Sequence, residues 1–293
     1  MKGTMLNPLS KLINKIFLII SLSIIPFTAS SEEKNINFIE TNWSFDGLFG
    51  TFDRASLQRG YQVYQEVCSG CHSIQHLSYR NLSEKGGPEF LVEDAKLIAS
   101  QFEVEDGPNS DGEMFMRPGR LSDKFVNPYP NVEASTAANG GAYPPDMSVL
   151  AKARAGGADY IYSLLLGYEE PPTGFELDDG VYYNQYMPGK KIKMSEPILD
   201  GIVEYSDGTE STKKQIAKDV TAFLVWASEP HLETQHRMGF KTIIYLFILI
   251  TLVYMSKQKV WSRFDSKVEE DETFDKVEKA VTEYEGEDPK TFK

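Results

Sequence analysis

Two cysteines and a histidine lie within five consecutive residues, Cys68-Ser69-Gly70-Cys71-His72. The Cys-x-x-Cys-His pattern is typical of covalent attachment of a c-type haem. If the stretch is helical, residues three and four apart share one face. Both thiols can then reach the two vinyl groups of one porphyrin, and His72 can present a ring nitrogen to the iron. We therefore expect one covalently bound haem c.

Two other uses of a Cys-x-x-Cys pair fit this sequence less well. A redox disulfide is expected in a strand–helix–strand context, whereas the residues around this pair read as helix. A structural zinc ion needs four ligands. The chain has only two cysteines, so His76, His231 and His236 would have to supply the rest. The pattern therefore favours haem.

Two longer helices are expected to position this motif. Asp53 is a suitable N-cap for a helix over residues 54–67, which leads directly into the motif. Its apolar face follows helical spacing at Leu57, Tyr61, Tyr64 and Cys68. A second helix, capped by Ser211 and ending at about Ser228, has its own apolar stripe. This arrangement resembles class I cytochromes c, in which two such helices cross, and Gly60 and Tyr64 are residue types suited to so close a crossing.

The chain between these helices is expected to be rich in loops. Residues 84–127 are punctuated by Gly-Pro pairs and strongly acidic, which indicates either a solvated surface or a docking patch for a basic protein. The remaining expected elements are a helix over 147–155 capped by Asp146, a helix over 158–166, an aromatic-rich loop over 181–194, and a hairpin over 202–210 that turns at Asp207-Gly208.

The net charge and the N-terminal residues indicate which partners and which cellular compartment to expect. The 293-residue chain has a formal charge of −13, which argues against nucleic-acid binding. Residues 1–30 contain lysines, then an apolar run, then small residues, as a secretory signal peptide does. An uncleaved anchor is the alternative. The segment contains no arginine, which favours a bacterial periplasmic address over an organellar transit peptide.

A second apolar segment runs from Met238 to Met255 and is about 27 Å long as a helix, close to the hydrocarbon thickness of a bilayer. A buried core helix would usually show a polar face, and this segment does not. We expect a single-pass protein of the bacterial inner membrane, with contacts to membrane lipid. Its predicted parts are a signal peptide (1–30), a periplasmic cytochrome c domain (31–236), a transmembrane helix (237–257) and an acidic cytoplasmic tail (258–293).

The spacing of residues does not identify the second axial ligand of the iron. A methionine would raise the reduction potential, a second histidine would lower it, and an empty position would permit ligand chemistry. The candidate methionines of the head domain are Met114, Met116, Met147, Met187 and Met194.

Many stretches together resemble the cytochrome c1 family, over roughly residues 40–260. They include Arg59 to His72, Asp106-Gly-Pro-Asn, Gly112-Glu-Met-Phe-Met-Arg-Pro-Gly-Arg, Asn139-Gly-Gly-Ala-Tyr-Pro-Pro-Asp, Gly167-Tyr-Glu-Glu-Pro-Pro-Thr-Gly and Trp226-Ala-Ser-Glu-Pro. The resemblance implies a mainly α fold: a class I-like cytochrome c domain with long loop insertions and one C-terminal transmembrane helix.

The resemblance also implies roles for particular residues. Cys68 and Cys71 would form the thioethers, and His72 and Met194 would be the axial ligands. Arg154 would pair with a haem propionate, for which its planar fork is suited. The implied haem-pocket residues are Pro144, Pro145, Tyr160 and, nearby, Asn139. Two departures stand out: three lysines (Lys190, Lys191 and Lys193) precede Met194, and Met187 occupies a position where an aromatic residue is common.

A member of this family would be the haem c subunit of quinol–cytochrome c oxidoreductase. It would take electrons from the Rieske iron–sulfur protein, pass them to a soluble cytochrome c, and assemble with cytochrome b. Electron transfer of this outer-sphere kind needs no general acid or base, so no catalytic residue is expected. Three alternatives stay open: a free membrane-anchored cytochrome serving a terminal oxidase, a haem enzyme or gas sensor with an open iron site, and a haem-free disulfide scaffold.

Overall fold

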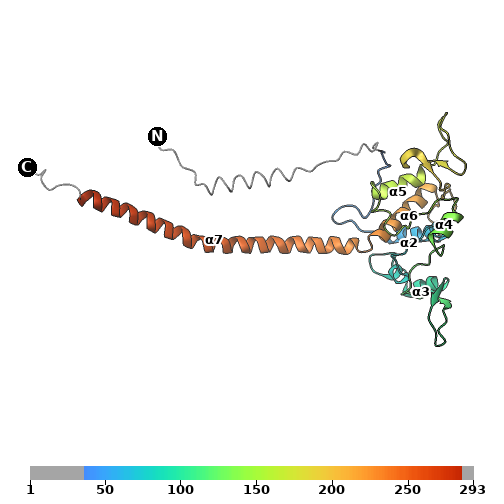
Figure 1. The fold of residues 1–293 in the computed structure, drawn as a ribbon, viewed down its shortest axis with the longest axis horizontal. Helices are drawn as coiled ribbons and strands as arrows, with labels where there is room; N and C mark the ends of the chain where they lie inside the picture. The colour runs from blue at the N-terminus through green and yellow to red at the C-terminus, as the bar shows by residue number, and fades with distance from the viewer. Residues whose placement is uncertain (1–35, 286–293) are drawn as a thin grey trace, which may run out of the picture. The chain divides into compact units, whose positions relative to one another are not determined.

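The structure is a computed structural model that describes residues 36–285 (Figure 1). The predicted signal peptide lies outside the described residues. The described α-helices are α2 (Arg54–Val63), α3 (Val92–Ser100), α4 (Val132–Ala138), α5 (Gly157–Leu166), α6 (Lys213–Ser228) and α7 (Leu232–Glu285). The shorter elements are a π-helical turn (Tyr64–Cys68), two 3-10 turns (Tyr79–Ser83 and Pro188–Lys190) and the strands β1 (Glu103–Asp106), β2 (Phe115–Pro118), β3 (Tyr182–Tyr183) and β4 (Lys191–Ile192). The mainly α fold is confirmed.

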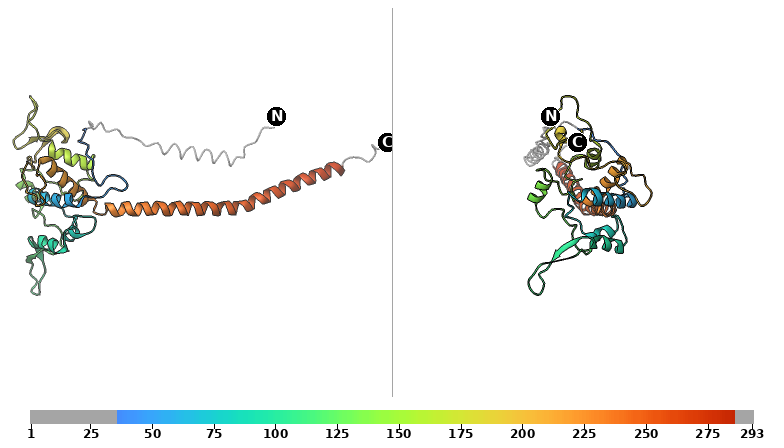
Figure 2. Two further views of the ribbon diagram at one scale, coloured as in Figure 1. Left: turned by 180° about the vertical axis from the view of Figure 1, so that it is seen from behind. Right: turned by 90° about the vertical axis from the view of Figure 1, so that its right-hand side faces the viewer.

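The helices α2 and α6 cross at the centre of the core (Figures 1 and 2). The Asp53 carboxylate accepts hydrogen bonds from the backbone of Ala55 and Ser56, so the predicted N-cap of α2 is confirmed. Gly60 permits the close approach, because a Cβ there would lie 2.7 Å from the Cβ of Phe223 and would overlap the Asp219 carbonyl oxygen.

Charged side chains reinforce the crossing. The carboxylate of Asp219, which is wholly buried, accepts hydrogen bonds from the Arg59 guanidinium at 2.8 Å and from the Ser56 hydroxyl at 2.7 Å. Arg59 also pairs with Asp207 at 2.7 Å. A buried carboxylate is tolerated only when it is paired and hydrogen-bonded, so these contacts fix the register between α2 and α6.

The acidic segment over 84–127 is more regular than the predicted loop. It contains α3 and an antiparallel hairpin in which Glu103 pairs with Pro118 and Asp106 with Phe115. Acidic residues in the first turn of α3 favour a helix start, and Ala95 and Ala99 give the helix a small buried face. The acidic composition of the segment as a whole predicts a loop, although these two shorter stretches have regular structure.

Three further local predictions need correction. Residues 147–155 form turns and not a helix, because bonds such as Leu150 N to Met147 O span only three residues. Residues 202–210 contain a turn closed by Gly208 N and Tyr205 O but no strand. The cap of α6 is Thr212, whose hydroxyl accepts from the Gln215 backbone. The helix predicted over 158–166 is confirmed as α5.

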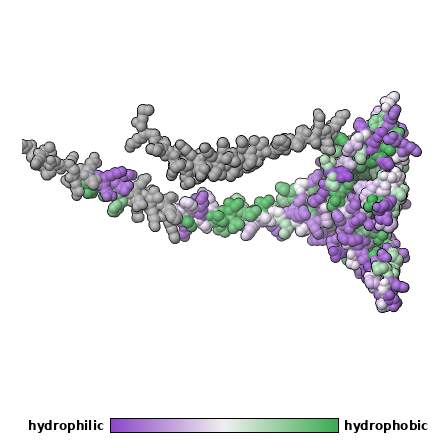
Figure 3. Space-filling view, in the orientation of Figure 1, coloured by the Kyte–Doolittle hydropathy of each residue, from purple (hydrophilic) through white to green (hydrophobic). Residues whose placement is uncertain are grey.

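The helix α7 contains the second apolar segment. Among the described residues, one helical stretch is long and apolar enough to cross a membrane, Leu232–Ser262, and its apolar window is entirely unburied by protein. Figure 3 shows these side chains as a green band on α7. The predicted span over 237–257 lies within this stretch, and the helix continues into the acidic tail as far as Glu285.

Candidate haem-binding site

The five-residue motif closes a single helical turn. The π-helical turn ends at Cys68, where the backbone N–H of Ser69 bonds to the Tyr64 carbonyl at 2.8 Å. The His72 N–H then donates to the Cys68 carbonyl at 2.9 Å, and the Cys71 N–H donates to the same oxygen at 3.1 Å. Cys68, Cys71 and His72 therefore stand on one turn, as predicted, although the helix widens just before it.

Both thiols of the motif are free in the structure. Burial raises the pKa of the Cys68 thiol to about 12, and the neighbouring Cys71 adds to the effect. A thiol that takes part in disulfide exchange usually has a lowered pKa, because the thiolate is the attacking species. The pKa of Cys68 is shifted in the opposite direction.

The imidazole of His72 is held in one orientation. The residue is 9% exposed, and Nδ1 lies 2.8 Å from the backbone carbonyl oxygen of Pro145. A carbonyl can only accept, so Nδ1 carries the proton and Nε2 keeps its lone pair. Burial lowers the pKa of His72, although the Pro145 bond and the charge of Asp146 oppose the shift. A neutral, oriented imidazole of this kind is suited to bind iron through Nε2.

Asp146 clamps the histidine segment to the segment that carries Pro145. Its carboxylate accepts hydrogen bonds from the Ser73 hydroxyl at 2.7 Å, the Gln75 N–H at 3.0 Å and the Ser148 N–H at 2.8 Å. The backbone N–H of Met147 also donates to the Ser73 carbonyl at 2.8 Å. The sequence pattern predicts a helix cap at Asp146, and the structure shows this clamp in its place.

The methionine loop contacts other predicted haem-pocket residues. The Lys193 ammonium donates to the Gly140 carbonyl at 3.0 Å, which brings the residue before Met194 next to Asn139. The Tyr168 hydroxyl donates to the Met194 carbonyl at 3.1 Å. Both Met187 and Met194 are half-buried. The sulfur of Met187 accepts a hydrogen bond from the Tyr160 hydroxyl at 3.9 Å.

The remaining predicted residues occupy separate places in the site. The guanidinium of Arg154 is exposed and donates to the Ala153 carbonyl at 3.0 Å; among the described residues it has no carboxylate partner. The Asn139 amide donates to the Ser135 carbonyl at 2.7 Å. Tyr160 is buried and contacts the ring of Phe38 edge-on. The structure brings Pro145 to His72, Tyr160 to Met187 and the Asn139 segment to the Met194 loop.

Comparisons with known proteins agree with this arrangement. Residues 43–264 match the sequence model of the Cytochrome C1 family. The chain belongs to the cytochrome c1 family. Members of this family are the electron-transfer haem subunits of the bc1 complex. Among the residues whose side chains the structure describes, no group of three or more His, Cys, Asp or Glu could hold a metal ion.

Several curated relatives are similar over most of the chain. Cytochrome c1, haem protein, of Schizosaccharomyces pombe is 48% identical, over 79% of this chain and 74% of its own length. The Saccharomyces cerevisiae protein of the same name is 48% identical, over 75% and 71%. Cytochrome b/c1 of Bradyrhizobium diazoefficiens is 46% identical over 75% of this chain, which spans only 35% of that longer protein.

The clamp at Asp146 is expected to weaken in acid. Partial burial opposes ionisation of Asp146, but the hydrogen bonds from Ser148, Ser73 and Gln75 outweigh it and hold the pKa below its ordinary value. A carboxylate with a lowered folded-state pKa stabilises the protein above the unfolded value of about 4, and this stabilisation is lost as the pH falls through the folded value.

Asp146→Asn should therefore lower the unfolding free energy at pH 7 by about 1–2 kcal/mol, and by less at pH 3. Urea unfolding followed by the haem absorbance measures both differences. Asp111→Asn, on the exposed hairpin, is the matched control and should change stability by less than about 0.5 kcal/mol. If Asp146→Asn lowers the unfolding free energy equally at both pH values, the charge of Asp146 does not contribute to stability.

Proposed function

We propose that this chain is the haem c subunit of a quinol–cytochrome c oxidoreductase, which receives electrons from the Rieske iron–sulfur protein and delivers them to a soluble cytochrome c. The observation that carries the proposal is the oriented imidazole of His72, which stands in a Cys-x-x-Cys-His turn with Nε2 available. Membership of the cytochrome c1 family supports the assignment to this complex.

The residues of the site fit one haem c. Cys68 and Cys71 would hold it through thioethers, and His72 and Met194 would be the axial ligands. When bound, the haem would supply a metal centre that gains and loses one electron. The chain's own contribution is to bury His72 and to keep it neutral and oriented through Pro145.

Met194 is the preferred distal ligand for two structural reasons. The Lys193–Gly140 contact holds the residue before Met194 beside the Asn139 segment. The sulfur of the rival, Met187, faces the hydroxyl of Tyr160. Tyr160 and Pro145 would then lie at the pocket wall with Asn139. The guanidinium of Arg154, which has no carboxylate partner among the described side chains, would bind a propionate.

The acidic surface suits a basic electron acceptor. The β1–β2 hairpin exposes Glu103, Glu105, Asp111 and Glu113. Such a surface would steer a cationic cytochrome c toward the head domain, and salt would screen the attraction. The same negative charge argues against nucleic acid as a partner.

We further propose that residues 1–30 export the head domain to the bacterial periplasm and that α7 anchors it in the inner membrane. The apolar stretch of α7 supports the anchor. The relatives named cytochrome b/c1 and cytochrome b-c1 complex catalytic subunit support cytochrome b as the partner within the membrane.

Purification in mild detergent tests the proposed complex. The chain should copurify with a b-type cytochrome and an iron–sulfur protein, and a reduced-minus-oxidised difference spectrum should show both c- and b-type haem. The preparation should oxidise quinol and reduce cytochrome c at a rate that falls with added salt. Recovery of the chain alone, with a c-type spectrum and no b-type signal, would favour the free membrane-anchored cytochrome.

A further inference from the structure

The loop over residues 46–50 exposes two large apolar side chains. Leu48 is 78% exposed and Phe49 is 76% exposed, which places both among the most exposed large apolar residues of the head domain. They are adjacent in sequence and flanked by Gly47 and Gly50. Apolar groups presented together at a loop tip indicate a surface that is covered by something other than water.

The loop is fixed against the first turns of α7 by contacts within the chain. The ring of Phe49 lies edge-on to the ring of Phe240, with centroids 5.9 Å apart. One turn earlier on α7, Nδ1 of His236 lies 3.2 Å from the Gly50 carbonyl oxygen. The loop therefore runs alongside α7, and its tip stands level with Phe240.

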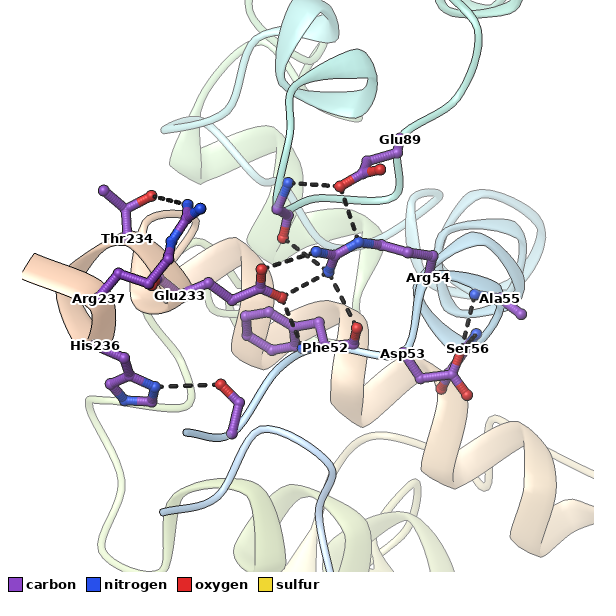
Figure 4. A network of polar contacts seen from close by, with 12 residues as sticks. Phe52, Asp53, Arg54, Ala55, Ser56, Glu89, Glu233, Thr234, His236 and Arg237 are labelled. Carbon is purple, nitrogen blue, oxygen red and sulfur yellow. Dashed lines mark hydrogen bonds and ion pairs between the residues drawn. The ribbon is translucent and has the colours of Figure 1, made fainter. Parts of the chain in front are cut away.

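A polar network continues this attachment as far as α2 (Figure 4). The carboxylate of Glu233 accepts two hydrogen bonds from the Arg54 guanidinium, both 2.8 Å long, and one from the Phe52 N–H at 2.9 Å. Arg54 also donates to Glu89 at 2.9 Å. Because Arg54 is the first residue of α2, the base of α7 and the start of α2 are joined through one bidentate ion pair.

The depth of the loop follows from its position along α7. The apolar segment of α7 runs from Met238 to Met255, so Phe240 lies in its first turn, about 3 Å from its start. The polar layer of a bilayer is roughly 5–7 Å thick on each side of the hydrocarbon. In the proposed span, Phe240 and the Phe49 ring packed on it therefore lie at the border between the hydrocarbon and this layer, where aromatic residues are enriched.

We propose that residues 46–50 form a second membrane contact, in which Leu48 and Phe49 enter the interfacial layer of the bilayer beside α7. The partner is lipid, because the loop continues the surface of a helix whose apolar window no other described part of the chain covers. The inference rests on the proposed role of α7 as a membrane anchor. It adds a second attachment point, so that the head domain rests on the membrane surface in one orientation.

The test places a fluorophore on a single cysteine in the haem-loaded complex, in which Cys68 and Cys71 carry no free thiol. The labelled variants are Leu48→Cys, Ile248→Cys within the anchor, and Val132→Cys on the exposed start of α4. Each complex is reconstituted in nanodiscs of phosphatidylcholine with and without a nitroxide at carbon 5 of the acyl chain. Quenching by the nitroxide reports contact with lipid, and quenching by iodide reports contact with water.

Lipid quenching at Leu48 and Ile248 but not at Val132 is the expected result, with at least a twofold loss of fluorescence at Leu48. Iodide quenching at Leu48 with lipid quenching at Ile248 would overturn the second contact and leave the anchor intact. Protection of Leu48 from both quenchers would mean that a partner subunit covers the loop, which also overturns the proposal. Absence of lipid quenching at Ile248 would instead refute the anchor itself.

Discussion

Gly60→Ala is expected to lower the unfolding free energy of the head domain by about 3 kcal/mol or more, or to prevent its folding. The added Cβ would lie 2.7 Å from both the Asp219 carbonyl carbon and the Phe223 Cβ. Both obstacles belong to α6, and a backbone carbonyl cannot rotate away as a flexible side chain can. The helices would have to separate, which would also stretch the Arg59–Asp219 ion pair.

Gly239→Ala is the matched control, because Gly239 also lies inside a helix but its added Cβ would meet no described atom within 4 Å. Alanine there should be neutral or slightly stabilising, as the better helix former. Thermal unfolding of both variants, followed by the haem absorbance in detergent, measures the difference. Equal melting temperatures for the two variants would mean that α2 and α6 do not cross at Gly60.

Met194→Leu should produce the largest functional change. Leucine keeps the volume of the side chain, so the fold should be retained at a cost below about 1.5 kcal/mol. It removes the thioether that we propose as the distal ligand. The low-spin spectrum should give way to a high-spin or carbon-monoxide-binding form. The reduction potential should fall by on the order of 0.1 V, within the roughly 0.8 V that axial ligands span.

Met187→Leu provides the matched comparison, because Met187 lies in the same loop, is similarly half-buried and has its sulfur toward Tyr160. This variant should keep the low-spin spectrum and change the potential little. A redox titration and an absorption spectrum of both variants decide the assignment. If Met187→Leu loses the low-spin spectrum and Met194→Leu keeps it, Met187 is the ligand.

Patterns that are local in sequence were sufficient for much of the fold. The Asp53 cap and apolar face predicted α2, and the stripe before Pro230 predicted α6 to within two residues at its start. The crossing of α2 and α6 was expected from the resemblance to class I cytochromes c, and Gly60 is a residue type suited to it. The family followed from many short motifs in order. The helix α3 and the β1–β2 hairpin were not predicted, because residues 84–127 are strongly acidic and α3 buries only two small side chains.

The geometry around His72 could not be predicted from local patterns. Its ring bonds to Pro145, which is 73 residues away, and the competing bonds of Asp146 to Ser73 and Gln75 span similar distances. From sequence alone, an Asp that precedes a short helical pattern is predicted to be the N-cap of a helix. The carboxylate of Asp146 instead accepts hydrogen bonds from Ser73 and Gln75, which are distant in sequence, and from Ser148, which is near. The residues 147–155 form turns where a helix was expected.

The Ser56–Asp219 hydrogen bond joins residues that are 163 positions apart. A chain made from its N-terminus produces the thiols of Cys68 and Cys71 long before α6 exists. Until then α2 lacks its packing partner, and the haem-binding turn belongs to an open segment. Only three residues separate α6 from α7, so the last piece of the core leaves the ribosome together with the proposed anchor. Closure of the head domain thus requires α6, whose residues are made just before those of the proposed anchor.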